Sequence, residues 1–209
     1  MTSGSATRVK KEQQKILDAV RAEQRRTDRR RIYLRRGAWI VSLLVLAGLV
    51  SAALLSSRAE TVTDSKTAAP FTMPLSNGES ASLADYAGEP VLLYFSSGAG
   101  CDSCITQMAG IEADPGFAEA GIAVLPIVMN TADEINAARV RFGVQAPFAL
   151  DDGTVSEAYG VLGVGMHPGL PGHGFVLVDA EGIQRWSGVY PSMWLDPEEL
   201  LGIVESELT

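Results

Sequence analysis

The chain contains a short apolar run, Val91–Phe95, that is followed by a loop and then by two cysteines. The run consists of aliphatic and aromatic residues, which is typical of a fully buried strand. Residues 96–100 contain two glycines and no apolar period, so the strand must end before them. Residues 105–111 repeat apolar side chains at three-residue steps, which indicates a helix. Cys101 and Cys104 therefore lie where a buried strand passes into the first turn of a helix.

The first turn of a helix is a favourable place for reactive cysteines. Its unpaired N–H groups and the positive end of the helix dipole stabilise a thiolate, the form that attacks disulfides and peroxides. Cys101 and Cys104 are the only cysteines in the chain, and their i, i+3 spacing places both on one helix face. We expect them to form an intramolecular disulfide with redox chemistry. A structural disulfide is the alternative, although so small a loop removes little unfolded-state entropy.

The two cysteines are expected to have different roles. Cys101 is nearer the helix N-terminus and is the expected attacking thiolate, whereas Cys104 resolves the mixed disulfide. Gly100 and Asp102, the neighbours of Cys101, are candidate supporting residues. The carboxylate of Asp102 is expected to oppose thiolate formation slightly, because a negative charge raises the pKa of a nearby thiol.

A second feature is the stretch of residues 37–57, which contains no charged residue and is rich in Leu, Val, Ala and Ile. It is long enough to cross the hydrocarbon core of a membrane as a helix. Residues 1–36 carry 12 Lys and Arg against 4 Asp and Glu, whereas the rest of the chain carries 5 against 21. This asymmetry predicts a cytoplasmic N-terminus and an extracytoplasmic remainder in the cell membrane. A cleaved signal peptide is the alternative to a retained single-pass anchor.

The predicted organisation has four parts. They are a basic cytoplasmic segment, a transmembrane helix, a linker rich in Ser, Thr and Ala, and a globular domain, over residues 1–36, 37–57, 58–70 and 71–209. Outside the cytoplasm a cysteine pair can stay oxidised unless a dedicated partner reduces it. The arginines beside the membrane span are expected to meet anionic lipid rather than nucleic acid. The chain has no glycine-rich phosphate loop and no dinucleotide fingerprint, so we expect no cofactor.

The globular domain is predicted to alternate strands and helices. After the cysteine helix, a second buried strand covers residues 121–129, and a helix follows over residues 132–142. Residues 175–186 form a hairpin around Ala-Glu-Gly, and Asp196 caps the last helix with a proline directly after it. This order of elements describes an α/β sandwich.

Several segments of this domain carry a resemblance to a known family. They are Phe71-Thr-Met-Pro-Leu, Asn77-Gly-Glu, Ser82-Leu-Ala-Asp-Tyr and Gly88-Glu-Pro-Val-Leu-Leu-Tyr-Phe near its start, and Tyr159-Gly-Val and His173-Gly-Phe-Val-Leu-Val-Asp near its end. Together they resemble the thioredoxin-like redoxins. That group spans the peroxiredoxin (alkyl hydroperoxide reductase and thiol-specific antioxidant) family and membrane-tethered thiol–disulfide proteins. The resemblance implies a thioredoxin-like fold, with a central mixed sheet flanked by helices, and an oxidoreductase of cell redox homeostasis.

The pattern around the cysteines departs from that of peroxiredoxins, which have proline seven and threonine three residues before the reactive cysteine. For Cys104 these places hold Ser97 and Cys101, and for Cys101 they hold Tyr94 and Gly98. We therefore expect a thiol–disulfide oxidoreductase that acts on protein thiols or disulfides with a reducing or oxidising partner. The first alternative is a peroxiredoxin-like thiol peroxidase that acts on hydroperoxide.

Two histidines bear on the alternatives. A peroxidase needs a donor that polarises the peroxide O–O bond, and His173, at the start of the late strand, is placed to supply it. A histidine hydrogen-bonded within a Gly- and Pro-rich loop is the simpler interpretation. The second alternative is a copper or zinc site, because Cys101-x2-Cys104 with His167-x5-His173 has suitable ligand types. Copper chaperones of cytochrome oxidase assembly also resemble membrane-tethered redoxins with two cysteines and a distant histidine.

Overall fold

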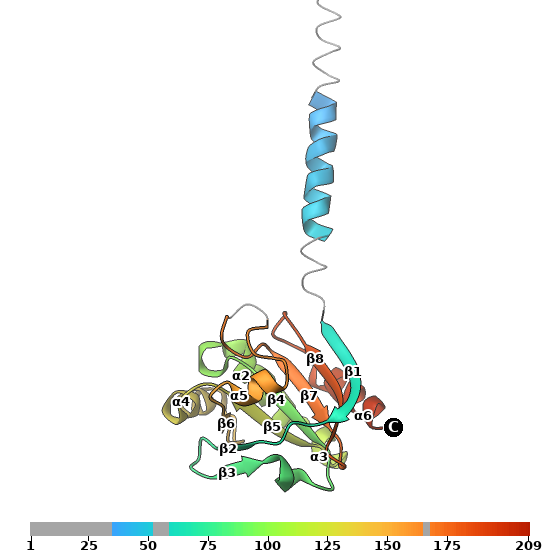
Figure 1. Cartoon of the computed structure of the whole chain (residues 1–209). Helices are drawn as coiled ribbons and strands as arrows, with labels where there is room; N and C mark the ends of the chain where they lie inside the picture. The colour runs from blue at the N-terminus through green and yellow to red at the C-terminus, as the bar shows by residue number, and fades with distance from the viewer. Residues whose placement is uncertain (1–34, 52–58, 165–167) are drawn as a thin grey trace, which may run out of the picture. The chain divides into compact units, whose positions relative to one another are not determined.

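The computed structural model describes residues 35–51, 59–164 and 168–209. The chain divides into two compact units, Met1–Ser56 and Ser57–Thr209, and each is described by itself. The described part of the first unit is a single helix over residues 35–51 with exposed side chains (Figure 1).

The predicted transmembrane helix, residues 37–57, lies only partly within the described residues. Residues 37–51 belong to the helix of the first unit, and residues 52–57 lie outside the described part of the chain. The predicted basic segment lies outside it as well, except for its last two residues. Among the residues that the structure describes, no helix is both long and apolar enough to span a membrane.

The second unit alternates strands and helices, as the sequence predicts. Its elements are β1 (Glu60–Thr67), β2 (Thr72–Pro74), β3 (Ser80–Ser82), η1 (Leu83–Tyr86), β4 (Val91–Phe95), η2 (Gly98–Gly100), α2 (Asp102–Ala113), α3 (Gly116–Glu119), β5 (Ala123–Val128), α4 (Ala132–Phe142), β6 (Ala149–Leu150), α5 (Thr154–Ala158), β7 (Gly174–Val178), β8 (Ile183–Val189) and α6 (Pro197–Leu208).

Six of the strands form one mixed sheet in the order β1-β8-β7-β4-β5-β6 (Figure 1). Strands β4, β5 and β6 run parallel, whereas β7, β8 and β1 continue the sheet by antiparallel pairing. Val91 of β4 lies opposite Ala123 of β5 and Val178 of β7, so β4 is hydrogen-bonded on both sides. The predicted central mixed sheet is confirmed, and the cysteines follow its central strand.

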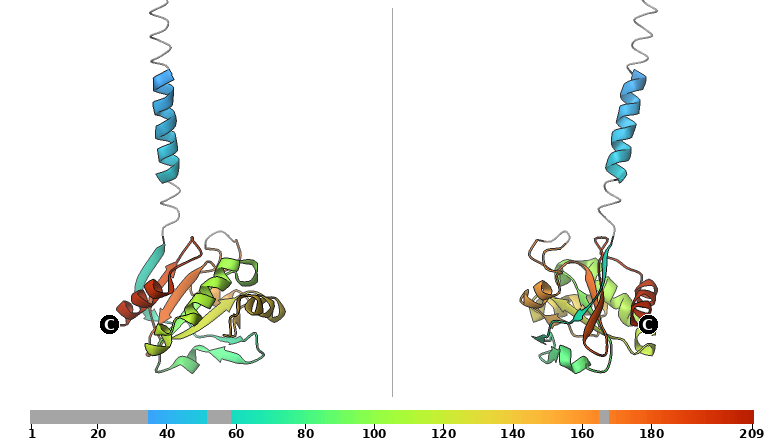
Figure 2. Two further views of the ribbon diagram at one scale, coloured as in Figure 1. Left: turned by 180° about the vertical axis from the view of Figure 1, so that it is seen from behind. Right: turned by 45° about the vertical axis from the view of Figure 1, so that its right-hand side comes forward.

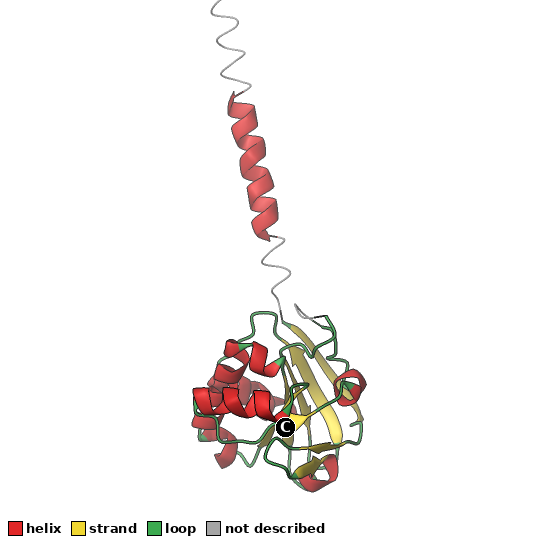
Figure 3. Ribbon diagram, turned by 90° about the vertical axis from the view of Figure 1, so that its left-hand side faces the viewer, coloured by secondary structure: helices red, strands yellow, loops and turns green. Residues whose placement is uncertain are grey.

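Side chains of β4 alternate between two hydrophobic cores. Leu92 and Tyr94 enter the core that contains side chains of α2, α3, α4 and α6. Val91, Leu93 and Phe95 enter the other core, which is covered by the β2–β3 hairpin and the segment after α5. Figures 2 and 3 show the larger helices against one face of the sheet. A strand that is buried on both faces needs apolar residues at every position, which is the pattern of β4.

The structure places a strand within the predicted linker of residues 58–70. Strand β1 pairs antiparallel with β8, from Glu60 opposite Val189 to Thr67 opposite Ile183. This edge strand is rich in Thr and Ser, so it lacks the apolar alternation by which sequence indicates a strand. Threonine and valine nevertheless favour extended backbone. The globular unit therefore includes β1 and begins before residue 71.

Candidate functional site

The loop between β4 and α2 is shaped by a glycine. Gly98 has a φ of 69°, a left-handed conformation that favours glycine. A Cβ at this position would collide with Oδ1 of Asn130 and approach Cγ1 of Val128. The same Asn130 oxygen accepts a 2.9 Å hydrogen bond from the N–H of Ala99. The predicted loop is thus a fixed 3₁₀ turn, η2, that ends directly before Cys101.

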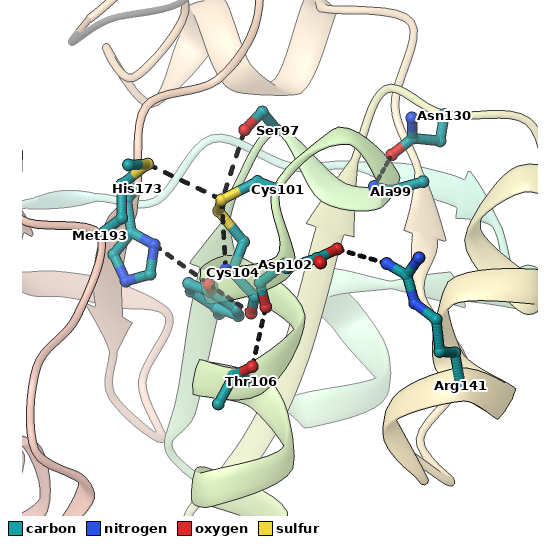
Figure 4. The surroundings of a disulfide bond; sticks show 11 residues. Ser97, Ala99, Cys101, Asp102, Cys104, Thr106, Asn130, Arg141, His173 and Met193 are labelled. Atoms are coloured by element: carbon teal, nitrogen blue, oxygen red, sulfur yellow. Dashed lines mark hydrogen bonds and ion pairs between the residues drawn. A yellow bond between two sulfur atoms is a disulfide. The ribbon is translucent and has the colours of Figure 1, made fainter.

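Cys101 and Cys104 form a disulfide at the start of α2, with their Cα atoms 5.3 Å apart (Figure 4). Cys101 is the N-cap of the helix, and its Sγ accepts a 3.2 Å hydrogen bond from the N–H of Cys104. The same N–H also donates to the backbone carbonyl of Cys101 at 3.0 Å, so Cys101 caps the first turn with both its sulfur and its carbonyl oxygen. In the reduced protein, the same N–H favours a Cys101 thiolate. The predicted intramolecular disulfide is confirmed.

The disulfide is largely covered. Only 8% of Cys101 and 1% of Cys104 is exposed. Met193 lies against it, with its Sδ 3.7 Å from Sγ of Cys101 (Figure 4). Cys101 is therefore the more exposed cysteine of the pair, and the thioether of Met193 contacts its sulfur.

A buried amide holds the segment of residues 190–195 beside the disulfide. Gln107 of α2 is fully buried and donates a 2.8 Å hydrogen bond to the carbonyl of Leu195. Its Oε1 accepts a 2.7 Å hydrogen bond from the N–H of Leu195. Within the segment, the N–H of Met193 donates to the carbonyl of Tyr190 at 2.9 Å. These bonds fix Met193 relative to the helix that carries the cysteines.

His173 lies directly before β7 and is 6% exposed. Its Nδ1 is 3.2 Å from the hydroxyl of Tyr94, and that hydroxyl donates a 2.9 Å hydrogen bond to the carbonyl of Cys104. Because the hydroxyl has only one hydrogen, Nδ1 of His173 must be the donor to Tyr94. Nε2 is then an acceptor, and it has no hydrogen-bond partner among the described residues. Burial lowers the pKa of His173 from 6.5 to about 4, so the ring is neutral at pH 7.

A small cavity of about 20 Å³ lies between Cys104 and His173. Ser97 and Met193 also line it, and Oγ of Ser97 is 3.8 Å from Sγ of Cys104. A space of this size holds one water-sized molecule. The cavity therefore lies against the less exposed cysteine of the pair.

Residues 65–187, more than half of the chain, match the AhpC/TSA family. The chain belongs to the AhpC/TSA family. Over 95 residues it is 33% identical to a Mycobacterium tuberculosis (strain ATCC 25618 / H37Rv) protein named as a candidate peroxiredoxin. That alignment covers 44% of this chain and 60% of the relative, so the chain spans about 60% of the length of this curated relative.

Solved structures of AhpC/TSA-like proteins share the fold. Peroxidoxin BcpB from Mycobacterium tuberculosis aligns with a TM-score of 0.58 and 18% identity over 69% of this chain and 97% of that one. AhpC from Enterococcus faecalis aligns with a TM-score of 0.61 and 17% identity over 68% and 90%. These similarities confirm the predicted thioredoxin-like α/β fold.

The two predicted supporting residues of this AhpC/TSA protein differ in their surroundings. The carboxylate of Asp102 forms an ion pair with Arg141 of α4 and points away from the sulfur atoms (Figure 4). Arg141 therefore offsets the negative charge that would oppose a thiolate. Gly100 has open space where a Cβ would be added, so the structure shows no steric reason for glycine at this position.

The predicted metal site falls partly on residues that the structure does not describe. His167 lies outside the described residues, whereas His173 and Cys104 line the same cavity. In the described part of the chain, no three His, Cys, Asp or Glu side chains are arranged to hold a metal ion. A copper or zinc site that includes His167 stays a prediction.

Three residues shape this AhpC/TSA site without being singled out by the sequence: Tyr94, Gln107 and Met193. Each makes its contact at the site with a residue that is not its neighbour in the sequence: Tyr94 with His173, Gln107 with Leu195, and Met193 with Cys101. Of the three, only Gln107 could have been identified from the sequence, because it is a polar residue on the helix face that also carries Cys104 and Ile111. A polar side chain on a buried helix face must have a hydrogen-bond partner, although its identity depends on the tertiary fold.

Proposed function

We propose that this protein is a thiol–disulfide oxidoreductase that acts through Cys101 and Cys104. The observation that carries the proposal is the disulfide at the N-terminus of α2, with Cys101 as the helix N-cap. Neither cysteine is preceded by the proline and threonine of the peroxiredoxin pattern, so exchange with protein thiols is favoured over peroxide reduction. A redox partner would restore the pair after each cycle.

The exchange balances as two thiol–disulfide steps. A substrate thiolate attacks Sγ of Cys101, and the bond to Cys104 breaks with Cys104 leaving as a thiolate. The second thiolate of the substrate then attacks the substrate sulfur that is bonded to Cys101. This forms the substrate disulfide and releases Cys101 as a thiolate. Two electrons pass from the substrate to the cysteine pair, and the reverse sequence reduces a substrate disulfide. Attack at Cys101 is favoured because it is the more exposed cysteine of the pair.

Trapping of the mixed disulfide tests the proposal. Cys104→Ser should accumulate a mixed disulfide between Cys101 and the partner, visible on non-reducing gels and by mass spectrometry. Cys101→Ser should trap nothing, and Ser103→Ala, at an exposed position between them, should behave as the wild type. The reverse order of trapping would make Cys104 the nucleophile, and no trapping by either folded variant would refute the exchange reaction.

A thiol peroxidase is the second candidate, and the cavity beside Cys104 favours it. A Cys104 thiolate would attack the outer oxygen of a hydroperoxide, break the O–O bond and release an alcohol or water. Cys101 would then condense with the Cys104 sulfenic acid, release water and re-form the disulfide. The predicted donor role of His173 does not fit this site, because its Nε2 is an acceptor. Nε2 of His173 would instead accept a hydrogen bond from the hydroperoxide O–H, and the leaving oxygen would take its proton from solvent.

Stopped-flow kinetics separate the two reactions. The reduced full-length chain is mixed in parallel with hydrogen peroxide and with a small model disulfide, and disulfide formation is followed by protein fluorescence. Faster oxidation by the model disulfide is expected from the first candidate. Rapid oxidation by low-micromolar peroxide, with slow reaction with the disulfide, would favour the peroxidase.

We also propose that the N-terminal part tethers the redoxin domain to the cell membrane, with the N-terminus cytoplasmic and the domain extracytoplasmic. The uncharged stretch of residues 37–57 and the basic residues that precede it support this topology. The full-length chain should remain in the membrane fraction after a carbonate wash, whereas a chain that begins at residue 59 should be released. Equal release of both chains would refute the tether.

A further inference from the structure

Three sulfur atoms from two distant parts of the chain meet at the site. Cys101 and Cys104 are bonded to each other, and Sδ of Met193 lies 3.7 Å from Sγ of Cys101 (Figure 4). Met193 follows Cys101 by 92 residues and reaches it through the segment of residues 190–195. Thiol–disulfide exchange uses the cysteines and gives no role to the thioether.

Met193 holds this position in an unfavourable backbone conformation. Its φ is 55°, and no other non-glycine residue in the described part of the chain has a positive φ. A side chain in this region costs about 1–2 kcal/mol. The two hydrogen bonds between Gln107 and Leu195 and the bond from Met193 to Tyr190 maintain it. Strain that buried hydrogen bonds maintain is concentrated at functional sites.

The three sulfurs are a soft ligand set once the disulfide is reduced. Thiolates and thioethers select Cu(I), whereas hard cations prefer oxygen ligands. Metal–sulfur bonds of about 2.3 Å place the sulfurs of a trigonal site about 4 Å apart, and the Cys101–Met193 separation is 3.7 Å. Zinc is less suited, because it takes four N, S or O ligands and the described residues offer no cluster of three His, Cys, Asp or Glu side chains.

We propose that Cys101, Cys104 and Met193 bind one Cu(I) ion when the disulfide is reduced. This site goes beyond thiol–disulfide exchange, although it uses the same cysteines. It also differs from the metal site predicted from the sequence, because the thioether of Met193 takes the place of the two histidines.

Copper binding is coupled to the redox state of the pair. A dithiol reductant supplies two electrons and two protons, which break the S–S bond and leave two thiols. Cu(I) then binds both sulfurs as thiolates and displaces the two protons, with no change in its own oxidation state. A substrate disulfide reverses the process: it takes two electrons from the cysteines and two protons from solvent, and the re-formed disulfide releases Cu(I).

A chelator competition tests the site. The full-length chain, reduced and freed of reductant under anaerobic conditions, is titrated with Cu(I) against bicinchoninate, a chromophoric chelator. The reduced chain should bind one Cu(I), and the oxidised chain should bind none. Met193→Leu should weaken binding by at least about tenfold, since the loss of even an outer partner of a ligand costs that much. Met129→Leu, which removes a thioether packed against Gly153, is the matched control and should bind as the wild type.

X-ray absorption at the copper edge supplies a readout that needs no variant. Three sulfur neighbours are expected in the wild type, and a nitrogen in place of the third sulfur would overturn the assignment of Met193. Equal affinity of the wild type and Met193→Leu, or no stoichiometric binding by the reduced wild type, would also overturn it. Disulfide trapping is performed without copper, so failure of the exchange reaction would leave a Met193-dependent copper site standing.

Discussion

At the residue scale, the first and last residues of η2 are both glycines, but their surroundings differ. Gly98 has a positive φ, and a Cβ there would collide with Asn130, whereas a Cβ at Gly100 would meet no atom within 4 Å. Gly98→Ala should therefore lower the free energy of unfolding by about 1–3 kcal/mol. Gly100→Ala should change it by less than about 0.5 kcal/mol. Urea unfolding of the two oxidised variants measures both effects, and equal losses would contradict the fixed turn.

The buried His173 predicts a pH-dependent stability. Its folded-state pKa is lowered to about 4 from 6.5, so between these values the unfolded chain binds a proton that the folded chain does not. Stability from this residue is thus fully present above pH 6.5 and is lost as pH falls toward 4. Between pH 7 and pH 5 the loss should be about 2 kcal/mol.

His173→Asn isolates this contribution, because the asparagine amide can still donate to Tyr94 but does not titrate. The variant and the wild type share every other titrating group, so the difference in their pH dependence reports His173 alone. Urea unfolding at pH 7, 6 and 5 should show a shallower dependence for the variant. Parallel curves would mean that His173 is not held neutral by burial.

The chemistry of the cysteines could be predicted from the sequence, but their surroundings could not. Cys101 and Cys104 follow a strand and begin a helix, and both features depend on residues within a short stretch. The charge partner of Asp102 and the tautomer of His173 depend on Arg141 and Tyr94, which tertiary packing brings to the site. No local pattern contains that information.

At the scale of elements, the segment of residues 190–195 depends on one side chain. Gln107→Leu would leave the N–H and carbonyl of Leu195 without their buried partner. The free energy of unfolding should fall by about 2–4 kcal/mol. Dithiothreitol should also reduce the disulfide faster, because Met193 is no longer held against Cys101.

Thr106→Ala is the control for this prediction. Thr106 precedes Gln107 on α2 and is exposed, and among the described residues its side chain hydrogen-bonds only to the carbonyl of Asp102. Its removal should leave the reduction rate unchanged and alter stability by less than about 0.5 kcal/mol. If both variants are reduced at the rate of the wild type, the segment does not control access to the disulfide.

The helices that begin at capping residues could be predicted from the sequence, whereas a strand that forms only by pairing with another strand could not. Thr131 and Glu134 form the capping box of α4, and Asp196 caps α6 with Pro197 at its first turn, so both helix starts follow from the sequence. Strand β1 has no buried apolar face of its own. It is a strand because its backbone pairs with the edge of β8, and that edge exists only in the folded sheet.

At the scale of the whole molecule, the predicted α/β domain is confirmed because its central strands are continuous apolar runs separated by helices. Strand β4 pairs with β5 and β7, and the cysteines follow from its end. The domain boundary could not be predicted in the same way, since β1 is polar and lies at the edge of the sheet.

The boundary yields a prediction about truncation. A chain that begins at residue 68 lacks β1, so the outer edge of β8 loses its hydrogen bonds, and the contact between Thr63 and Glu207 of α6 is lost. Each lost bond contributes about 0.5–1.5 kcal/mol, so the free energy of unfolding should fall by more than about 2 kcal/mol. The uncovered edge should also promote association. A chain that begins at residue 59 keeps β1 and should be monomeric and more stable by that amount. Light scattering and urea unfolding compare the two, and equal behaviour would mean that residues 60–67 serve only as a linker.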